Sequence, residues 1–466
     1  MRPRTSKIAP SRSGSGLAAP EASAAPAHSA DAAGAVGDDE LEALFAFLAD
    51  YPLVIAAVSG GADSIGMMRL IARWQQRRAQ PPKVTIATVD HGLRPASRAE
   101  AEWVVARAQE LGFEAALLTW SGEKPTTGIQ DAARAARYAL LADLARRSAP
   151  QGRVAIVTAH TEDDQAETLL MRLARGSGVD GLAGMAPARP LDGDKRVMLL
   201  RPLLSVAGER LRATLRSLNA EWIEDPSNDA TRFERVQVRK ARDVLALLGI
   251  DNEKIALSAR RLARAKAAID AGVDKLKRDA ALDLHAGAFA SFDRGVWLGA
   301  PEELRIRMLG GLIGSFGGQS EPLRLSQLEA LVTRMEREGF EGATLAGAMV
   351  SQHGGIVRVQ REPGRVPLPS LVLVPGASAT WDGRFFVAAS DRAPAPIEVR
   401  PLGGDGYAAL RRQLDPAPHL PASAAATLPS FWRSGSLIAV PTLTAVMGPV
   451  AALEGAAGLY SAEFLR

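Results

Sequence analysis

The sequence contains no cysteine, and this absence removes several kinds of chemistry. With 0 Cys in 466 residues, the chain has no disulfide, no thiolate metal site and no cysteine nucleophile. Long apolar runs are also missing, since no stretch approaches the roughly 20 uninterrupted apolar residues of a membrane helix. We therefore expect a cytoplasmic protein without membrane spans, whose chemistry depends on oxygen and nitrogen side chains.

Neither sign of charge is in large excess. The 56 Lys and Arg residues nearly balance the 52 Asp and Glu residues, which leaves a net charge of +4. This mildly basic balance permits an RNA partner without demonstrating one. A hydrophobic content of 47% with 23% charged residues is typical of a globular protein. A chain of this length predicts two or three domains.

Changes of composition along the chain predict four segments. Residues 1–38 are mostly Ala, Ser, Pro and Gly without apolar periodicity, so we expect a disordered extension. Residues 39–248 alternate short apolar runs with helical patterns, which predicts an α/β domain. Residues 249–360 are interpreted as a helical domain. Residues 371–466, after a Pro-punctuated boundary, are interpreted as a small α+β domain.

The segment 39–248 predicts an α/β fold with a parallel, Rossmann-like sheet. Strands that alternate with helices of ordinary length favour parallel pairing and a sheet covered by helices. The predicted strands are 53–58, 84–89, 115–119, 154–158 and 197–200. The predicted helices are 65–74, 97–111, 129–147 and 164–175.

A glycine-containing loop connects the first predicted strand to the first predicted helix. Its residues are Ser59, Gly60, Gly61, Ala62, Asp63 and Ser64. Glycines let the backbone approach a ligand and direct N–H groups toward it, and a helix N-terminus adds positive partial charge. The serine hydroxyls suit phosphate oxygens, and Asp63 suits a metal or an amine. The loop therefore predicts an anion site, with a plain capped turn as the alternative.

Two well-known phosphate motifs do not fit this loop. The chain has no G-x-x-x-x-G-K-[ST] sequence, and no G-x-G-x-x-G sequence follows the strand. The remaining pattern, S-G-G-x-D-S, resembles the pyrophosphate loop (PP-loop) of the N-type ATP pyrophosphatases. That resemblance implies that the protein binds ATP and cleaves it to AMP and pyrophosphate.

An ordered series of further motifs resembles one branch of that superfamily, the tRNA(Ile)-lysidine synthetases. The series covers the first domain nearly end to end, and its order makes it far more specific than any one motif. Its members are Asp90-His91-Gly92-Leu93-Arg94, Ala133-Arg134-Ala135-Ala136-Arg137-Tyr138, His160-Thr161-Glu162-Asp163-Asp164-Gln165-Ala166-Glu167-Thr168, Arg175-Gly176-Ser177-Gly178, Arg201-Pro202-Leu203-Leu204 and Asp225-Pro226-Ser227-Asn228.

The resemblance implies a reaction, a set of site residues and roles for two segments. Residues 39–248 would be the catalytic domain, and residues 371–466 would contact tRNA, with a module that only packs as the alternative. ATP would adenylate the C2 oxygen of the wobble cytidine in the CAU anticodon of tRNA(Ile). Free lysine would then attack through its side-chain amine and expel AMP. Pyrophosphate and Mg²⁺ would lie at the 59–64 loop. The implied catalytic residues are Asp63, Arg137, His160, Asp164, Arg235 and Arg239, and the implied metal ligands are Asp63 and Glu167.

Elementary geometry supports part of this assignment. The ends of parallel strands converge at the carboxyl edge of a sheet, so the 59–64 loop, His91 and His160 should meet there. Asp164 and Glu167 are spaced to share one helix face, where they would bind Mg²⁺ or a lysine ammonium. The alternative for this pair is a solvated acidic helix start.

Two motifs depart from the family pattern. The lesser departure is Ala159, which stands where the family usually has Gly before the histidine of the 160–168 motif. After Asp225-Pro226-Ser227-Asn228 the family is expected to have R-N-x-x-R, whereas this chain has Val236 in place of the asparagine. Arg235 and Arg239 are retained. The polar positioning that the asparagine would give is therefore absent or supplied by another residue.

Two rival functions remain open. Another PP-loop tRNA-modifying enzyme is the nearer one, although members that depend on cysteine or an iron–sulfur cluster are excluded by the lack of cysteine. The other is a non-catalytic, nucleotide-gated RNA-binding protein, against which the retained Asp63, Asp164 and Glu167 argue. The expected partners are tRNA(Ile) with a CAU anticodon and free lysine, and a homodimer is allowed.

Overall fold

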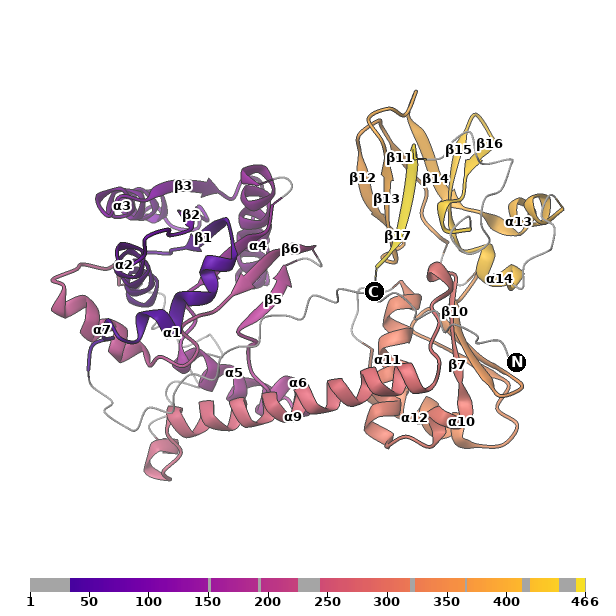
Figure 1. The fold of residues 1–466 in the computed structure, drawn as a ribbon, viewed down its shortest axis with the longest axis horizontal. Coiled ribbons are helices and arrows are strands. Elements are labelled where there is room, and N and C mark those ends of the chain that lie inside the picture. Colours follow the sequence, from indigo (N-terminus) through magenta and orange to yellow (C-terminus); the bar gives the residue numbers. More distant parts are fainter. Residues whose placement is uncertain are drawn as a thin grey trace, which may run out of the picture. The chain divides into compact units, whose positions relative to one another are not determined.

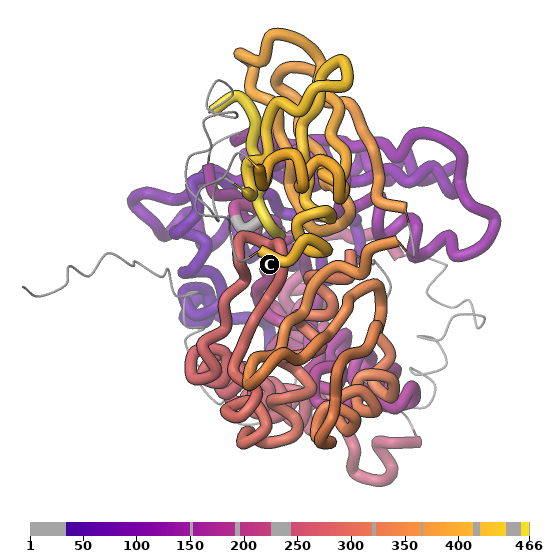
Figure 2. Tube along the Cα trace, turned by 90° about the vertical axis from the view of Figure 1, so that its right-hand side faces the viewer, coloured from indigo at the N-terminus to yellow at the C-terminus, as the bar shows by residue number. Residues whose placement is uncertain are grey.

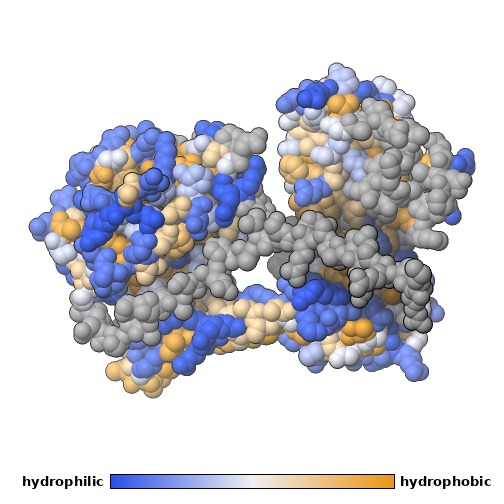
Figure 3. Space-filling view, viewed as in Figure 1, coloured by the Kyte–Doolittle hydropathy of each residue, from blue (hydrophilic) through white to orange (hydrophobic). Residues whose placement is uncertain are grey.

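The computed structural model describes residues 34–149, 152–191, 194–224, 244–318, 323–364, 367–412, 420–443 and 458–465. The chain divides into two compact units, residues 1–266 and 267–466. Arg235 and Arg239 lie outside the described residues. Within those ranges, no helix combines the length and apolarity that crossing a membrane would require. Hydrophilic side chains cover much of the visible surface, with apolar ones scattered among them (Figure 3).

The first unit contains a six-stranded sheet in the order β3-β2-β1-β4-β6-β5. The β3, β2, β1, β4 and β6 strands are parallel neighbours, and β5 pairs antiparallel with β6 at the edge. The predicted α/β class with a Rossmann-like parallel sheet is thus confirmed. The strands are β1 (Leu53–Ala57), β2 (Lys83–Asp90), β3 (Glu114–Thr119), β4 (Val154–Thr158), β5 (Ala188–Leu191) and β6 (Asp194–Leu200).

Helices cover both faces of this sheet (Figure 1). Alternate residues of β1 explain why, because Val54 and Ala56 face one apolar cluster while Leu53 and Ile55 face another. The first cluster also includes side chains of α2, α3 and α7, and the second includes side chains of α4. The helices are α1 (Leu41–Phe45), the 3-10 helix η1 (Ala46–Asp50), α2 (Ala62–Gln76), α3 (Ser97–Glu110), α4 (Ile129–Ser148), α5 (Glu162–Ala174), α6 (Val179–Leu182) and α7 (Gly208–Ser217).

The topology of this sheet creates a switch point beside β1. The strand pairs with β2 on one side and with β4 on the other, and Ala57 is in register with both Ala87 and Thr158. The chain leaves β1 and β4 toward helices that start at Ala62 and Glu162. Open α/β sheets bind ligands at such a point, outside the carboxyl ends of the strands. The fold therefore brings the segments after β1 and β4 to one edge.

Residues 34–38 differ from the prediction of a disordered extension up to residue 38. Val36 is buried in the core of the first unit, with 1% of its surface exposed. Its backbone N–H donates to Oγ1 of Thr214 at 2.8 Å, and Asp38 forms an ion pair with Arg77 at 2.5 Å. The prediction from composition was wrong here because a single valine among small and polar residues gives no periodic pattern. In the structure Val36 nevertheless packs in the core that includes α7.

The second unit contains three antiparallel sheets (Figures 1 and 2), in which β17 returns to lie beside β13. Their orders are β7-β10-β9-β8, β11-β14-β15-β16 and β12-β13-β17. The strands are β7 (Phe289–Asp293), β8 (Gly342–Leu345), β9 (Ala348–His353), β10 (Ile356–Arg361), β11 (Leu371–Leu373), β12 (Ser378–Trp381), β13 (Phe385–Ala389), β14 (Ile397–Pro401), β15 (Pro429–Arg433), β16 (Ser436–Ala439) and β17 (Tyr460–Phe464).

The segment predicted to be helical, 249–360, also contains the sheet β7-β10-β9-β8. Its strands have only 4–6 residues and lie in a stretch rich in glycine turns, so the longer helical pattern dominated the prediction. The helices of this segment are α9 (Asn252–Asp279), the 3-10 helix η3 (His285–Gly287), α10 (Arg294–Leu298), α11 (Glu302–Gly317) and α12 (Leu325–Glu336), and farther along the chain follow α13 (Gly403–Arg411) and α14 (Ala422–Ala425).

A buried charge cluster connects the sheets of the second unit across the boundary predicted near residues 360–371. Nε and Nη2 of Arg361, at the end of β10, lie 3.1 and 3.3 Å from the carboxylate oxygens of Asp382. Nε of Arg384 lies 2.6 Å from the same carboxylate. All three side chains are at most 6% exposed. Residues on both sides of the predicted boundary thus belong to one compact unit.

Candidate active site

The loop after β1 has the geometry of an anion cradle. Gly61 is the N-cap of α2 and has no side chain with which to cap this helix N-terminus. The first N–H groups of α2 therefore have no acceptor from an N-cap side chain, and they carry the positive end of the helix dipole. A Cβ built on Gly61 meets only Oγ of Ser59, at 3.9 Å. The protein thus leaves space beside these N–H groups for a ligand.

Gly60 is required by its neighbours rather than by a ligand. Its φ of +96° is a conformation that L side chains rarely adopt, and a Cβ there would lie 2.7 Å from Cδ1 of Ile223. The Gly60 carbonyl accepts the N–H of Ile223 at 2.9 Å. The segment containing Ile223 therefore holds the loop in shape from behind.

The two serines of the loop fix its ends together. Oγ of Ser64 accepts the N–H of Ser59 at 3.2 Å and donates to the Gly61 carbonyl at 2.9 Å. The two hydroxyl oxygens are 3.3 Å apart. Ser64 is 6% exposed, whereas Ser59 is exposed. In this arrangement Ser64 shapes the loop, and Ser59 is the hydroxyl that faces solvent.

Two carboxylates from different segments lie against the first residue of α7. A Cβ built on Gly208 would lie 3.3 Å from Oδ1 of Asp63 and 2.8 Å from Oδ2 of Asp163. Oδ2 of Asp163 accepts the N–H of Gly208 at 2.9 Å, and its other oxygen accepts from the amide of Asn252. Sequence reasoning missed Asp163 beside Asp63. The two adjacent aspartates, Asp163 and Asp164, could have indicated it. Adjacent helix positions point in different directions, so only one of the two can cap the helix while the other faces a neighbouring segment.

Asp164, the predicted catalytic carboxylate, caps its own helix. Its Oδ2 accepts the N–H of Thr161 at 2.9 Å and the Thr161 hydroxyl at 3.2 Å, which completes a capping box at the start of α5. Glu167 lies one turn later on α5 and is 1% exposed. A buried carboxylate is costly without compensating interactions, so Glu167 is held by its surroundings.

His160 follows β4 and lies at the same edge as the loop. Its Nδ1 is 2.9 Å from the hydroxyl of Thr158, and its side chain is partly exposed. The hydroxyl orients the ring and leaves Nε2 on the side away from Thr158. The predicted position at the strand end is confirmed, and its catalytic role stays a prediction.

His91 and the predicted site residue Arg137 interact electrostatically across the same edge. Burial first, and the nearby Arg137 guanidinium second, lower the pKa of His91 to about 4, while Asp90 opposes the shift. Asp90 itself accepts from Ser97 Oγ at 2.6 Å and Gly92 N–H at 2.8 Å. Hydrogen bonding from Ser97 first, and from Gly92 after it, lowers the pKa of Asp90. His91 is therefore neutral near pH 7.

Other motif residues stabilise the scaffold. The amide of Gln165 donates to the Met185 carbonyl at 3.0 Å and accepts the Met185 N–H at 2.7 Å. Arg201 is 5% exposed, and its guanidinium donates to the Ala186 carbonyl at 2.6 Å. Both side chains hold the backbone of the turn between α6 and β5. We infer that these two motif residues stabilise the fold at this edge of the sheet.

The comparisons with known proteins agree with this geometry. Residues 39–244 match the family described as the PP-loop domain. The chain is 43% identical over 346 residues to a tRNA(Ile)-lysidine synthase of Bradyrhizobium sp., a match that covers 70% of this chain and 94% of that protein. It is 39% identical over 416 residues to the tRNA(Ile)-lysidine synthase of Ruegeria pomeroyi, covering 88% and 93%.

Likeness to solved structures is much weaker. A U34-tRNA thiolase from Methanococcus maripaludis is 18% identical with a TM-score of 0.38, and the match covers 46% of this chain and 72% of that one.

The parallel sheet, the uncapped helix N-terminus and the S-G-G-x-D-S loop define a PP-loop, ATP-binding protein. Within that class, the relatives are more specific. The chain belongs to the tRNA(Ile)-lysidine synthase family, whose members are ATP-dependent ligases that form a carbon–nitrogen bond.

Proposed function

We propose that this chain, in the cytoplasm, modifies the wobble cytidine of tRNA(Ile) with a CAU anticodon in two steps. In the first step, the C2 oxygen of the cytidine attacks the α-phosphorus of ATP and pyrophosphate leaves. In the second step, the side-chain amine of free lysine attacks C2, the C2–oxygen bond breaks, and AMP leaves. A proton released from the amine restores a neutral, lysine-substituted base.

The observation that carries this proposal is the edge where the 59–64 loop, His91 and the start of α5 are assembled. The loop offers N–H groups without side-chain caps and space beside Gly61, which suits the pyrophosphate of ATP. Arg137, from α4, is close enough to His91 to lower its pKa, so its positive charge lies at this edge, where it would meet phosphate. We assign Arg137 and His160 to the adenylation step.

Acidic side chains supply the other half of the chemistry. We assign Asp63 to the metal or the lysine amine, and Asp164 and Glu167 to the lysine ammonium, with Glu167 as a second metal ligand. Among the described residues, no group of three or more potential ligands could hold a metal ion alone. Mg²⁺ commonly takes one or two carboxylates together with phosphate oxygens and water, so this donor set fits it. When bound, the ion would neutralise charge on the phosphates.

The test is AMP formation that depends on lysine and on the correct tRNA. Purified full-length protein with ATP, lysine and a CAU-anticodon tRNA(Ile) transcript should release AMP and incorporate lysine into the tRNA. A transcript whose wobble C is replaced by U is the matched control and should give neither product. AMP release that is independent of lysine, or equal with both transcripts, would contradict the proposal.

A further inference from the structure

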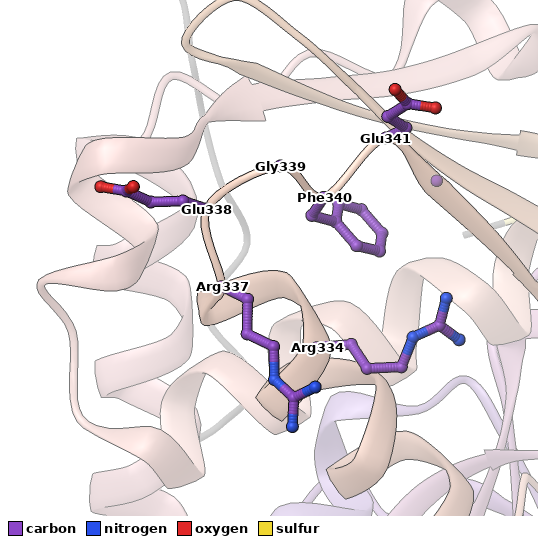
Figure 4. A pocket seen from close by; sticks show the side chains of 7 residues that line it. Arg334, Arg337, Glu338, Gly339, Phe340 and Glu341 are labelled. Carbon is purple, nitrogen blue, oxygen red and sulfur yellow. The ribbon is translucent and has the colours of Figure 1, made fainter.

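The second unit contains a hollow that the proposed reaction does not use. It lies between the end of α12 and the start of β8 and has a volume of about 310 Å³. Two arginines, Arg334 and Arg337, line it together with Phe340 and the turn 338–342 (Figure 4). Gly339, with a φ of +79°, allows the turn that brings Phe340 over the hollow.

The two arginines have no partner of their own in the part of the chain that the structure describes. Both side chains are exposed, and neither forms an ion pair nor donates a side-chain hydrogen bond there. Neighbouring arginines are engaged instead. Arg305 pairs with Glu336 at 2.7 Å, and Arg307 pairs with Glu303 at 2.7 Å. Two unpaired guanidiniums that line one hollow are groups of the kind that arginine supplies for phosphate.

Nearby negative charge is compensated or turned away. The end of a helix has exposed carbonyls, but the Arg294 guanidinium donates to the Met335 carbonyl at 2.7 Å and to the Arg337 carbonyl at 3.4 Å. The side chains of Glu338 and Glu341 point away from the two arginines (Figure 4). An anion would therefore approach guanidiniums rather than carboxylates.

Phe340 adds a surface for a base. The side chain is half-buried and packs against the apolar core of the second unit, which fixes the ring. In Figure 4 the ring lies on the side of the hollow opposite the arginine side chains. A fixed aromatic ring next to positive charge is the combination that binds unstacked nucleotides, because bases stack on the ring and phosphates meet the cations.

We propose that this hollow binds one nucleotide of the tRNA substrate, with its phosphate on Arg334 and Arg337 and its base against Phe340. The identity of the RNA rests on the proposed function. The hollow itself is a second RNA contact, contributed by the unit that does not contain the PP-loop.

The experiment measures binding of the CAU-anticodon tRNA to full-length protein over a series of salt concentrations. Arg334→Ala and Arg337→Ala should each weaken binding and flatten the plot of log affinity against log salt by about one unit. Arg324→Ala removes the same charge from the exposed N-terminal end of α12 and serves as the matched control. It should leave the slope near that of the unmodified protein.

A second substitution tests the aromatic ring of Phe340 without changing the charge of the hollow. Phe340→Leu keeps an apolar side chain for packing but removes the aromatic face, so we expect affinity to fall about fivefold or more with the slope unchanged. Thermal melting of each variant confirms that the fold is retained. Slopes for both arginine variants that equal the Arg324→Ala slope, with unchanged affinity for Phe340→Leu, would overturn the proposal.

Two further arms separate this inference from the reaction. Binding of free AMP that is lost in the arginine variants, with tRNA binding unchanged, would show a mononucleotide site and overturn the RNA assignment. If the unmodified protein makes lysine-dependent AMP but the salt slopes do not change, only the hollow is disproved. If it makes no lysine-dependent AMP but the slopes flatten, the hollow stands as an RNA site and the proposed reaction fails.

Discussion

The two units use carboxylates for different purposes. Asp63 lies in the first turn of α2, where the chain leaves space beside Gly61 at the carboxyl edge of a parallel sheet. Asp382 is enclosed by two guanidiniums between antiparallel sheets, with 6% of its side chain exposed. A carboxylate at a sheet edge can meet a ligand, whereas one between sheets can only hold the fold. We therefore expect that substituting Asp63 lowers activity and that substituting Asp382 lowers stability.

The largest effect that we expect is on Asp382. Replacing it with alanine leaves Arg361 and Arg384 buried without their shared counter-ion, and breaking a buried pair in this way costs about 3–5 kcal/mol. Burial already lowers the pKa of Arg384 to about 10, which shows how strongly this site disfavours an uncompensated charge. Chemical denaturation should show the second unit unfolding at much lower denaturant concentration.

Asp391→Asn is the control for that measurement, because Asp391 is an exposed carboxylate in the same unit. It should change stability by no more than about 0.5 kcal/mol. Similar losses for the two variants would mean that the charge cluster does not hold the sheets together. The cluster also predicts that deleting residues 366–466 destabilises what remains, since the deletion removes Asp382, the counter-ion of Arg361, and the residues packed around it.

Asp63 should behave in the opposite way. We expect Asp63→Asn to lower lysine-dependent AMP formation at least about hundredfold, the loss typical of removing one electrostatic contact in a catalytic site. Its melting temperature should stay close to that of the unmodified protein, because the amide keeps the shape of the side chain. A variant with normal turnover, or one that fails to fold, would remove the contrast with Asp382.

Asp164→Asn distinguishes capping from substrate binding. The amide oxygen can still accept the N–H of Thr161, so the cap and the melting temperature should be nearly preserved. If Asp164 binds the lysine ammonium, the KM for lysine should rise while the KM for ATP stays the same. A variant with unchanged KM for lysine would leave Asp164 as a cap and direct attention to Asp163.

The contrast also explains what could be predicted from the sequence. The parallel sheet, its order of helices and the loop at Ser59 were accessible, because a buried strand, two glycines and a helix start are local patterns. The edge where His91 and His160 lie followed from strand direction alone. These predictions concern residues that would contact a ligand, and such residues are recognised from their spacing in a short stretch of sequence.

The failures concern contacts between distant residues. Nothing local distinguishes Asp382 from an exposed turn residue, because its partner Arg361 is 21 residues away. The pairing of Asp63 with Asp163 at Gly208 requires three segments to fold together. Val36 gave no signal for the same reason, since its partner Thr214 is 178 residues away.

Val36 offers a test of intermediate size. Removing residues 1–33 should leave stability and turnover unchanged, because that composition cannot form a core. Removing residues 1–38 also takes away the buried Val36 and the ion pair of Asp38, which should cost about 1.5–3 kcal/mol. Thermal melting of the two truncated proteins measures the difference. Equal melting temperatures would show that residues 34–38 contribute nothing to the first unit.

The smallest effect that we expect separates two histidines, one in each unit. Burial is the main cause of the lowered pKa of both His91 and His285. At His91 the charges of Arg137 and Lys124 lower it further, to about 4. At His285 the carboxylate of Asp283 opposes the shift, and the ring stacks on Phe289 with centroids 3.9 Å apart. His91 should therefore be the stronger source of acid sensitivity.

The direction of the effect follows from which state binds the proton first. The pKa of His91 is near its ordinary value of 6.5 in the unfolded chain and about 4 in the fold, so the unfolded chain is protonated first as the pH falls. The contribution of neutral His91 to stability is present above pH 6.5 and is lost as the pH falls toward 4. After a reduction for partial solvent screening, we expect about 1 kcal/mol of this loss by pH 5.

Urea denaturation of the unmodified protein and of His91→Gln at pH 7.5 and pH 5 isolates this contribution, because other titrating groups are common to both. The glutamine variant should lose less stability between the two pH values than the unmodified protein does. His285→Gln should change that difference in the same direction but by less, since Asp283 stabilises the protonated ring. A larger effect at His285 would show that burial, and not the cations around the proposed site, sets the acid sensitivity of this protein.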